Sequence, residues 1–310
     1  MATSRRPTAV RHRGLTRSTT TIGTATANDR SQLFRADPSS YCYHVVNDVW
    51  AVGDAYERYV GRWSRRVAVA FLRWLGVPAR KQWLDVGCGT GALTAAVVAE
   101  ADPAEVVGVD PSEGFLAHAR TAIGDARVTF RAGDAQALPL PDREFDAVVS
   151  GLALNFVPDP RRAAAEFARV ARSGGVAAAY VWDYAEGMEM MRHFWETATA
   201  LDPAAAEIAE TMRFPLCRPE PLRELWTDAG MGDVTVHAIE VPTAFADFDD
   251  YWSPFLGGQG PAPGYVVSLP NERRQALRDA LRARLPAGAD GSIRLTARAW
   301  AVSGDPPRLR

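Results

Sequence analysis

Alternating glycines behind a buried acid form the part of this sequence best suited to hold a polar ligand. In WLDVGCGTGALT, residues 83–94, Gly87, Gly89 and Gly91 follow a short apolar run that contains Asp85. Glycine lets the main chain adopt positive φ and lets a ligand approach it closely. If a strand precedes the turn and a helix follows, the free N–H groups of the helix start face the same ligand. The spacing, with alanine in the last place, also satisfies the relaxed dinucleotide fingerprint.

Two further acids end the next apolar runs. Asp110 closes EVVGVD, where a carboxylate can accept hydrogen bonds from both hydroxyls of a ribose, and Asp134 in GDA could accept one from the exocyclic amine of an adenine. Asp85 is costly to bury unless it is paired, and a ligand ammonium, directly or through water, would pair with it. NAD and S-adenosylmethionine both fit the ribose acid. S-adenosylmethionine, which carries an ammonium, a ribose and an adenine but no phosphate, suits the three acids better.

The elements around these residues alternate between strand and helix patterns. The expected helices and strands are a helix over 54–76, a strand over 82–87, a helix over 91–100, a strand over 105–110, a helix over 111–120 with Ser112 near its N-cap, strands over 126–135 and 145–150, a helix over 160–175 and a strand over 176–183. This alternation predicts a parallel sheet with helices on both faces, and its strands then end at one common edge.

The alternation stops after Tyr184. The expected elements there are helices over 186–201, 219–231 and 270–286 and strands over 232–245 and 291–304, the two strands pairing antiparallel at the sheet edge. The predicted fold is therefore an α/β, doubly wound, mostly parallel seven-stranded sheet of the Rossmann-like kind, with helical insertions that form an acceptor cap.

The same patterns divide the chain. The expected parts are a disordered tail over 1–45 and one domain over 46–310, made of a cofactor-binding core over 54–184, a segment of helices and a strand with the cap over 185–292, and a final edge strand over 293–303.

Four motifs in order carry a resemblance to a known family. LDVGCGTG, VVGVDPS, RAGDAQALPLPDREFDAVVS and RVARSGGV resemble successive motifs of class I S-adenosylmethionine-dependent methyltransferases, most of all the small-molecule type 11 group related to quinone-biosynthesis methyltransferases. The resemblance covers about Tyr56 to Asp183. The part after Asp183 matches the family poorly, so the resemblance does not indicate the acceptor.

The resemblance implies a role for each matching residue. The methionine end of the cofactor would be lined by Asp85, Gly87, Gly89 and Gly91. The ribose would bind Asp110, with Pro111 and Ser112 beside it, and the adenine would be held by Asp134 and Ala135. Two residues, Tyr56 and Arg62, would close over the cofactor, and Asn155 would lie near the methyl group.

Methyl transfer from a sulfonium needs alignment and exclusion of water, and it requires neither a nucleophilic triad nor a metal. A hydroxyl acceptor would benefit from a base, and the candidates at the strand ends are Asn155 (orienting only), Asp183 and Tyr184. Trp252 and Phe255 are the expected walls of a site for a flat or apolar small-molecule acceptor. Two alternatives stay open: an NAD(P)-dependent oxidoreductase, and a non-catalytic S-adenosylmethionine-binding protein.

Composition limits the remaining classes. The 310 residues are 47% hydrophobic and carry a net charge of −2, which gives no electrostatic case for nucleic acid. No apolar run is long enough to span a bilayer. The three cysteines lie far apart in sequence, without metal-ligand spacing, which fits a reducing cytoplasm.

Overall fold

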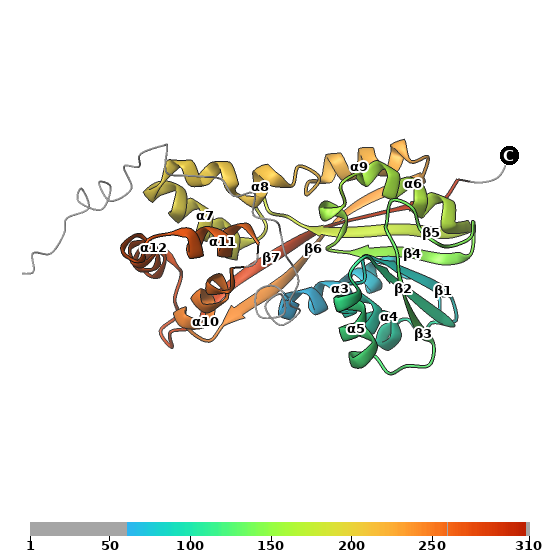
Figure 1. The fold of residues 1–310 in the computed structure, drawn as a ribbon, viewed down its shortest axis with the longest axis horizontal. Helices are drawn as coiled ribbons and strands as arrows, with labels where there is room; N and C mark the ends of the chain where they lie inside the picture. The colour runs from blue at the N-terminus through green and yellow to red at the C-terminus, as the bar shows by residue number, and fades with distance from the viewer. Residues whose placement is uncertain (1–60, 259, 308–310) are drawn as a thin grey trace, which may run out of the picture.

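The computed structural model describes residues 61–258 and 260–307, and in these ranges seven strands form one sheet (Figure 1). The expected residue Tyr56 and the expected tail over 1–45 lie outside the described residues. In sheet order the strands are β3 (Val128–Ala132), β2 (Glu105–Asp110), β1 (Gln82–Val86), β4 (Phe145–Gly151), β5 (Ala171–Trp182), β7 (Ile293–Asp305) and β6 (Gly232–Phe245). The first five pair in parallel, and β7 runs antiparallel to both β5 and β6, which confirms the predicted fold class.

Helices cover both faces of this sheet and bury apolar side chains against it. These helices are α3 (Arg62–Leu75), α4 (Ala92–Glu100), α5 (Glu113–Ala122), η3 (Leu154–Phe156), α6 (Pro160–Val170) and α9 (Pro219–Asp228). Phe71 of α3 packs on Tyr180 of β5 with ring centroids 4.7 Å apart, within one buried cluster. Phe167 of α6 meets Trp226 of α9 at 6.2 Å within the other.

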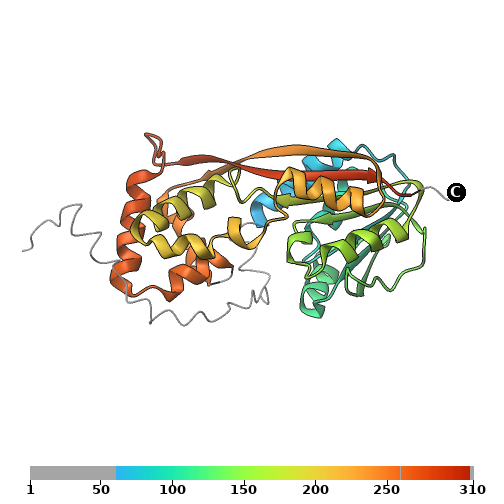
Figure 2. The same ribbon diagram turned by 90° about the horizontal axis from the view of Figure 1, so that it is seen from above.

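Strands β6 and β7 are long enough to extend beyond the rest of the sheet. Residues 299–304 of β7 pair with β5, whereas residues 293–298 pair with β6 past the carboxyl end of β5. Figures 1 and 2 show this two-stranded ribbon running from the sheet to a group of helices, which we call the cap and define as residues 189–213 and 248–284. The cap contains α7 (Glu189–Leu201), η4 (Pro203–Ile208), α8 (Glu210–Arg213), α10 (Phe248–Trp252), η5 (Ser253–Gly257), α11 (Pro261–Ser268) and α12 (Asn271–Arg284).

Aromatic side chains fill the interior of the cap. Phe194 stacks on Phe255 with centroids 4.6 Å apart, and the Tyr251 hydroxyl donates to the carbonyl oxygen of Met190 at 2.8 Å. Trp252 and Phe255 are both buried there, so they stabilise the cap rather than line an open acceptor site as we expected from the sequence. Across the described ranges, no helix has both the length and the apolar character needed to cross a bilayer.

One predicted boundary is wrong. The helix expected to run to residue 175 ends at Val170, and β5 begins at Ala171, which pairs with Phe145 of β4. The register then shifts, and Val176 pairs with Ala147. This irregularity in the pairing leaves four residues of β5 opposite one of β4, and it occupies the glycine-containing segment that the sequence suggested as a helix end.

Candidate functional site

The glycine turn adopts a conformation that other residues rarely take. Gly87, Gly89 and Gly91 have φ of 71°, 52° and 91° between β1 and α4. A Cβ on Gly87 would lie 2.5 Å from the Cβ of Ala153, and one on Gly91 would lie 2.6 Å from Cδ1 of Ile123. The turn is therefore restricted to glycine by backbone conformation at all three positions and also by space at Gly87.

A cavity of about 500 Å³ opens at this turn, along the carboxyl ends of β1, β2 and β4. Its volume falls in the range of small-molecule and cofactor sites. The expected site residues that line it are Asp85, Gly87, Gly89, Asp110, Pro111, Ser112, Asp134 and Ala135. These residues come from separate stretches of sequence, and the parallel strand order brings them to one edge of the sheet.

Asp85 lines the cavity and has no solvent-exposed surface. Its Oδ2 accepts a hydrogen bond from the Thr94 hydroxyl at 2.7 Å, whereas its Oδ1 has no hydrogen-bond partner. Burial raises the pKa of Asp85 to about 7, against the lowering effect of the Thr94 hydrogen bond. An unpartnered buried carboxylate oxygen beside a cavity is a site where a cation would be stabilised.

Asp110 is held in place by main-chain donors. Its Oδ2 accepts from the N–H of Gly89 at 2.9 Å, and its Oδ1 accepts from the N–H of Ser112 at 2.8 Å. Burial raises the pKa of Asp110, and these two hydrogen bonds oppose that effect. Each carboxylate oxygen can accept a second hydrogen bond, so the group is fixed in orientation and can still bind a diol.

Asp134 is exposed on the loop after β3. Its Oδ1 accepts from the main-chain N–H of Gln136 at 2.9 Å, and both of its oxygens lie 3.0 Å from the side-chain amide nitrogen of Gln136. Two hydrogen bonds lower the pKa of Asp134: the larger effect comes from the main-chain N–H of Gln136 and the smaller one from its side-chain amide. The group is therefore a carboxylate at neutral pH.

Arg62 and Asp183 are engaged in ion pairs away from the cavity lining. Nη1 of Arg62 binds Asp250 of α10 at 3.0 Å, which connects α3 to the cap. Both oxygens of the buried Asp183 are used: Oδ2 accepts from Nε of Arg298 at 2.7 Å, and Oδ1 accepts from the N–H groups of Ala185 and Glu186 at 3.1 Å. Asp183 therefore ties the end of β5 to the ribbon.

Tyr184, Asn155 and Gly91 are also absent from the cavity lining. Tyr184 packs on Phe214 with ring centroids 5.5 Å apart, and Phe214 in turn meets the cavity-lining Phe156 at 5.1 Å. Asn155 lies in η3 next to Phe156, and its buried Nδ2 has no hydrogen-bond partner.

Several lining residues were not singled out from the sequence. They include Ser64, Phe115, Leu152, Phe156 and Tyr180. Phe156 is 37% exposed, so part of its ring is open to a molecule in the cavity. Phe156 lies in a 3₁₀ helix of three residues, which is too short to show a periodic sequence pattern. Its position next to Asn155 is the sequence feature that could have indicated it.

Comparison with known proteins gives a consistent result. Residues 84–179 match a family model described as a methyltransferase domain. A demethylmenaquinone methyltransferase of Roseiflexus castenholzii is 30% identical over 214 residues, which cover 65% of this chain and 85% of that protein. A 2-methyl-6-phytyl-1,4-hydroquinone methyltransferase of Oryza sativa subsp. japonica is 38% identical over 118 residues, but these cover 38% of this chain and 34% of that relative.

Solved structures share the fold at low sequence identity. The YcgJ protein of Bacillus subtilis superposes with a TM-score of 0.52 at 17% identity, covering 79% of this chain and 99% of that one. A phosphoethanolamine N-methyltransferase 2 of Haemonchus contortus, solved with S-adenosyl-L-methionine, gives 0.51 at 18% identity, covering 82% and 56%. The sequence relatives, the domain match and the strand-end cavity together place this chain in the class I S-adenosylmethionine-dependent methyltransferases, in the type 11 group related to quinone-biosynthesis methyltransferases.

Proposed function

We propose that this protein transfers the methyl group of S-adenosylmethionine to a small, flat, apolar or aromatic acceptor. The observation that carries the cofactor part is Asp85 Oδ1, which is buried, unpartnered and beside the cavity at the glycine turn. An α-ammonium would supply the missing partner and would favour the ionised carboxylate. A nicotinamide dinucleotide offers no such amino group to this position.

The remaining contacts follow from the positions of the other acids. Asp110, fixed by Gly89 and Ser112, would accept from the ribose hydroxyls. Asp134 would accept from the adenine amine, and the adjacent Ala135 would contact the base. The methionine part would lie against the bare main chain at Gly87, where the nearby Ala153 leaves no room for a side chain.

The acceptor part of the proposal depends on aromatic rings at the cavity. Phe156 lines the cavity and is partly exposed, and its ring packs on Phe214, which packs in turn on Tyr184. A flat ring packed on Phe156 would gain apolar contact and ring–ring attraction. Two relatives named for a hydroquinone and for demethylmenaquinone support an acceptor of this chemical class.

Bound S-adenosylmethionine supplies an electrophilic methyl group, so this chain's residues need to align the acceptor and exclude water. We propose that Asn155, whose Nδ2 is unpartnered, orients an acceptor oxygen. Tyr184 would support Phe156 from outside the cavity lining, through its contact with Phe214. Asp183 would fix the junction between β5 and the ribbon, because Arg298 and two main-chain N–H groups already use its oxygens.

The test is methyl transfer from radiolabelled S-adenosylmethionine to a panel of phenols and hydroquinones, with aliphatic amines as the contrasting class. We expect turnover with a planar hydroxyl-bearing ring and a loss of kcat/KM of about tenfold in Phe156→Ala, as for removal of a packed aromatic contact. Val267→Ala, at an exposed apolar residue of α11, is the matched control. Turnover with the amines alone would contradict the acceptor class.

A further inference from the structure

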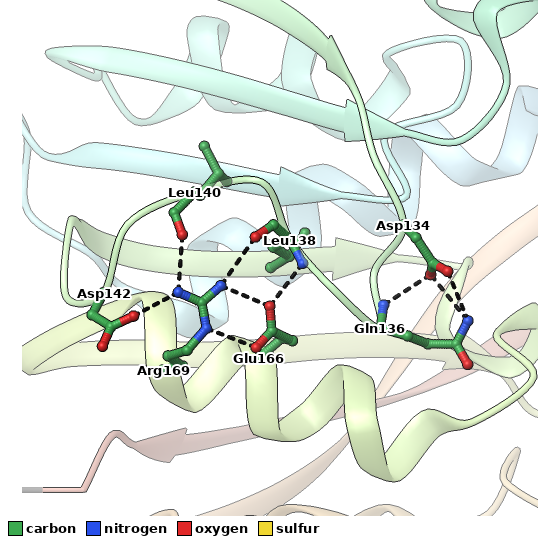
Figure 3. Close-up of polar contacts among 7 residues, drawn as sticks. All are labelled: Asp134, Gln136, Leu138, Leu140, Asp142, Glu166 and Arg169. Atoms are coloured by element: carbon green, nitrogen blue, oxygen red, sulfur yellow. Dashed lines mark hydrogen bonds and ion pairs between the residues drawn. The ribbon is translucent and has the colours of Figure 1, made fainter.

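Arg169 of α6 donates hydrogen bonds from all three of its guanidinium nitrogens. The acceptors lie on the loop over residues 134–142 and on Glu166 of the same helix. Nη1 of Arg169 donates to the carbonyl oxygen of Leu140 at 2.9 Å and to Oδ1 of Asp142 at 2.6 Å. Nη2 donates to the carbonyl oxygen of Leu138 at 3.1 Å and to Glu166 at 2.7 Å, and Nε donates to the other oxygen of Glu166 at 2.7 Å. These five bonds match the five N–H donors that a guanidinium possesses (Figure 3).

Glu166 completes the contact with the same loop. Its Oε2 accepts from the main-chain N–H of Leu138 at 2.7 Å, so both main-chain polar groups of Leu138 bind the Glu166–Arg169 pair. The side chains of Leu138 and Leu140 are buried beneath the loop. The hydrogen bond from Arg169 lowers the pKa of Glu166, and the pair is charged at neutral pH. The loop is therefore fixed by charge-assisted bonds and by apolar burial.

The other end of this loop is part of the candidate site. Asp134 lines the cavity, and its carboxylate is oriented by Gln136 (Figure 3). The side-chain oxygen of Gln136 accepts from the N–H of Asp159, the N-cap residue of α6, at 3.2 Å. Helix α6 thus holds the loop at two places, through its N-terminus near Asp134 and through Arg169 on its last turn.

We infer that Arg169 is a positioning residue for cofactor binding, which holds the 134–142 loop so that Asp134 faces the exocyclic amine of the adenine. This inference rests on the proposed function. Arg169 touches no ligand itself; it acts through the loop backbone. A lysine cannot replace it, because an ammonium has three donors and cannot present the planar fork that meets Glu166 and two carbonyl groups together.

The experiment measures how strongly the protein distinguishes two ligands. Isothermal titration gives the Kd for S-adenosylhomocysteine and for S-inosylhomocysteine, in which a carbonyl oxygen replaces the adenine amine. For the full wild-type chain we expect a preference of about tenfold or more for S-adenosylhomocysteine, since the lost bond involves a charged acceptor. In Arg169→Lys and Arg169→Gln we expect the preference to fall to about twofold, because a displaced Asp134 no longer recognises the amine.

Three further variants separate positioning from general destabilisation. Arg161→Lys changes an exposed arginine of the same helix, whose partner is Asp228, and should keep the wild-type preference. Asp142→Ala removes one exposed partner of Arg169 and should keep most of the wild-type preference for S-adenosylhomocysteine. Glu166→Gln weakens the Glu166–Arg169 pair, while the amide oxygen can still accept from the main-chain N–H of Leu138. The preference for S-adenosylhomocysteine must fall in this variant too. Glu166→Gln decides the question if the Arg169 variants do not fold.

The outcomes are distinct. A lower Tm with an unchanged ligand preference in Glu166→Gln and the folded Arg169 variants would overturn the inference, because a merely structural role weakens both ligands equally. The inference is also overturned if the wild-type chain binds S-adenosylhomocysteine but does not prefer it to S-inosylhomocysteine, and the proposed function then stands. If the wild-type chain binds neither ligand, the proposed function falls together with this inference.

Discussion

Replacing Asp85 by Asn should make the ligand-free protein more stable at pH 8 and make it bind cofactor less well. Asp85 is fully buried, and burial raises its pKa from 3.8 to about 7. The neutral acid is therefore favoured in the folded state. Asn resembles that neutral form, keeps an acceptor for the Thr94 hydroxyl, and cannot ionise.

The magnitude follows from linkage between protonation and folding. The pKa of Asp85 is higher in the folded state, about 7, than the ordinary value of 3.8 that applies to the unfolded chain. The protonated side chain therefore contributes its full stability below pH 3.8, and this contribution is lost as pH rises to about 7. That difference corresponds to about 4 kcal/mol, an upper bound because an amide nitrogen would replace the unpartnered oxygen. We expect a gain in the free energy of unfolding of about 2–4 kcal/mol at pH 8 and almost none near pH 4.

Urea unfolding followed by tryptophan fluorescence, at pH 4 and at pH 8, measures this difference. Asp279→Asn, at an exposed acid of α12, is the matched control and should show no such pH dependence. Titration with S-adenosylhomocysteine should show a loss of affinity of about tenfold to a hundredfold in Asp85→Asn, from the lost charged hydrogen bond. An Asp85→Asn protein less stable than wild type at pH 8, or one with unchanged affinity, would refute the reasoning.

Three other outcomes follow from the same geometry. The affinity of the wild-type protein for S-adenosylhomocysteine should rise with pH up to about 7 and then level off, because the ammonium binds ionised Asp85; a flat titration profile would contradict this. Gly87→Ala should lower Tm and abolish ligand binding, whereas Gly174→Ala, which has positive φ but free space, should cost only about 1 kcal/mol, as urea titration would measure. Asp183→Asn should cost about 2–3 kcal/mol, because it replaces the buried carboxylate nearest to Arg298 by a neutral amide. Calorimetry should find the S-adenosylhomocysteine affinity within about twofold of wild type.

The parts of the fold that depend on local pattern could be predicted from the sequence. The strand ending at Asp110 has the expected bounds, and Ser112 caps α5 by accepting from the N–H of Phe115 as expected. The positive φ of Gly87 follows from the alternating glycines at residues 87–91. These features are encoded within a few residues, where apolar runs, glycines and capping side chains act on their own neighbours.

The parts that depend on distant partners could not be predicted. Asp183 looked like a free carboxylate at a strand end, but its partner Arg298 lies 115 positions further along the chain. Arg62 likewise binds Asp250, 188 positions away. The end of α6 was misplaced because pairing with β4 extends β5 backwards to Ala171. Side-chain partners and strand register are set by tertiary packing, which a single sequence does not encode locally.

The most direct test of the central claim is a crystal structure of the full chain with S-adenosylhomocysteine. We predict that the amino group of the ligand lies about 3 Å from Oδ1 of Asp85 and that the ribose hydroxyls lie within hydrogen-bond distance of Asp110. A ligand seated away from the glycine turn, or one whose amino group has no contact with Asp85 either directly or through one water, would contradict the account.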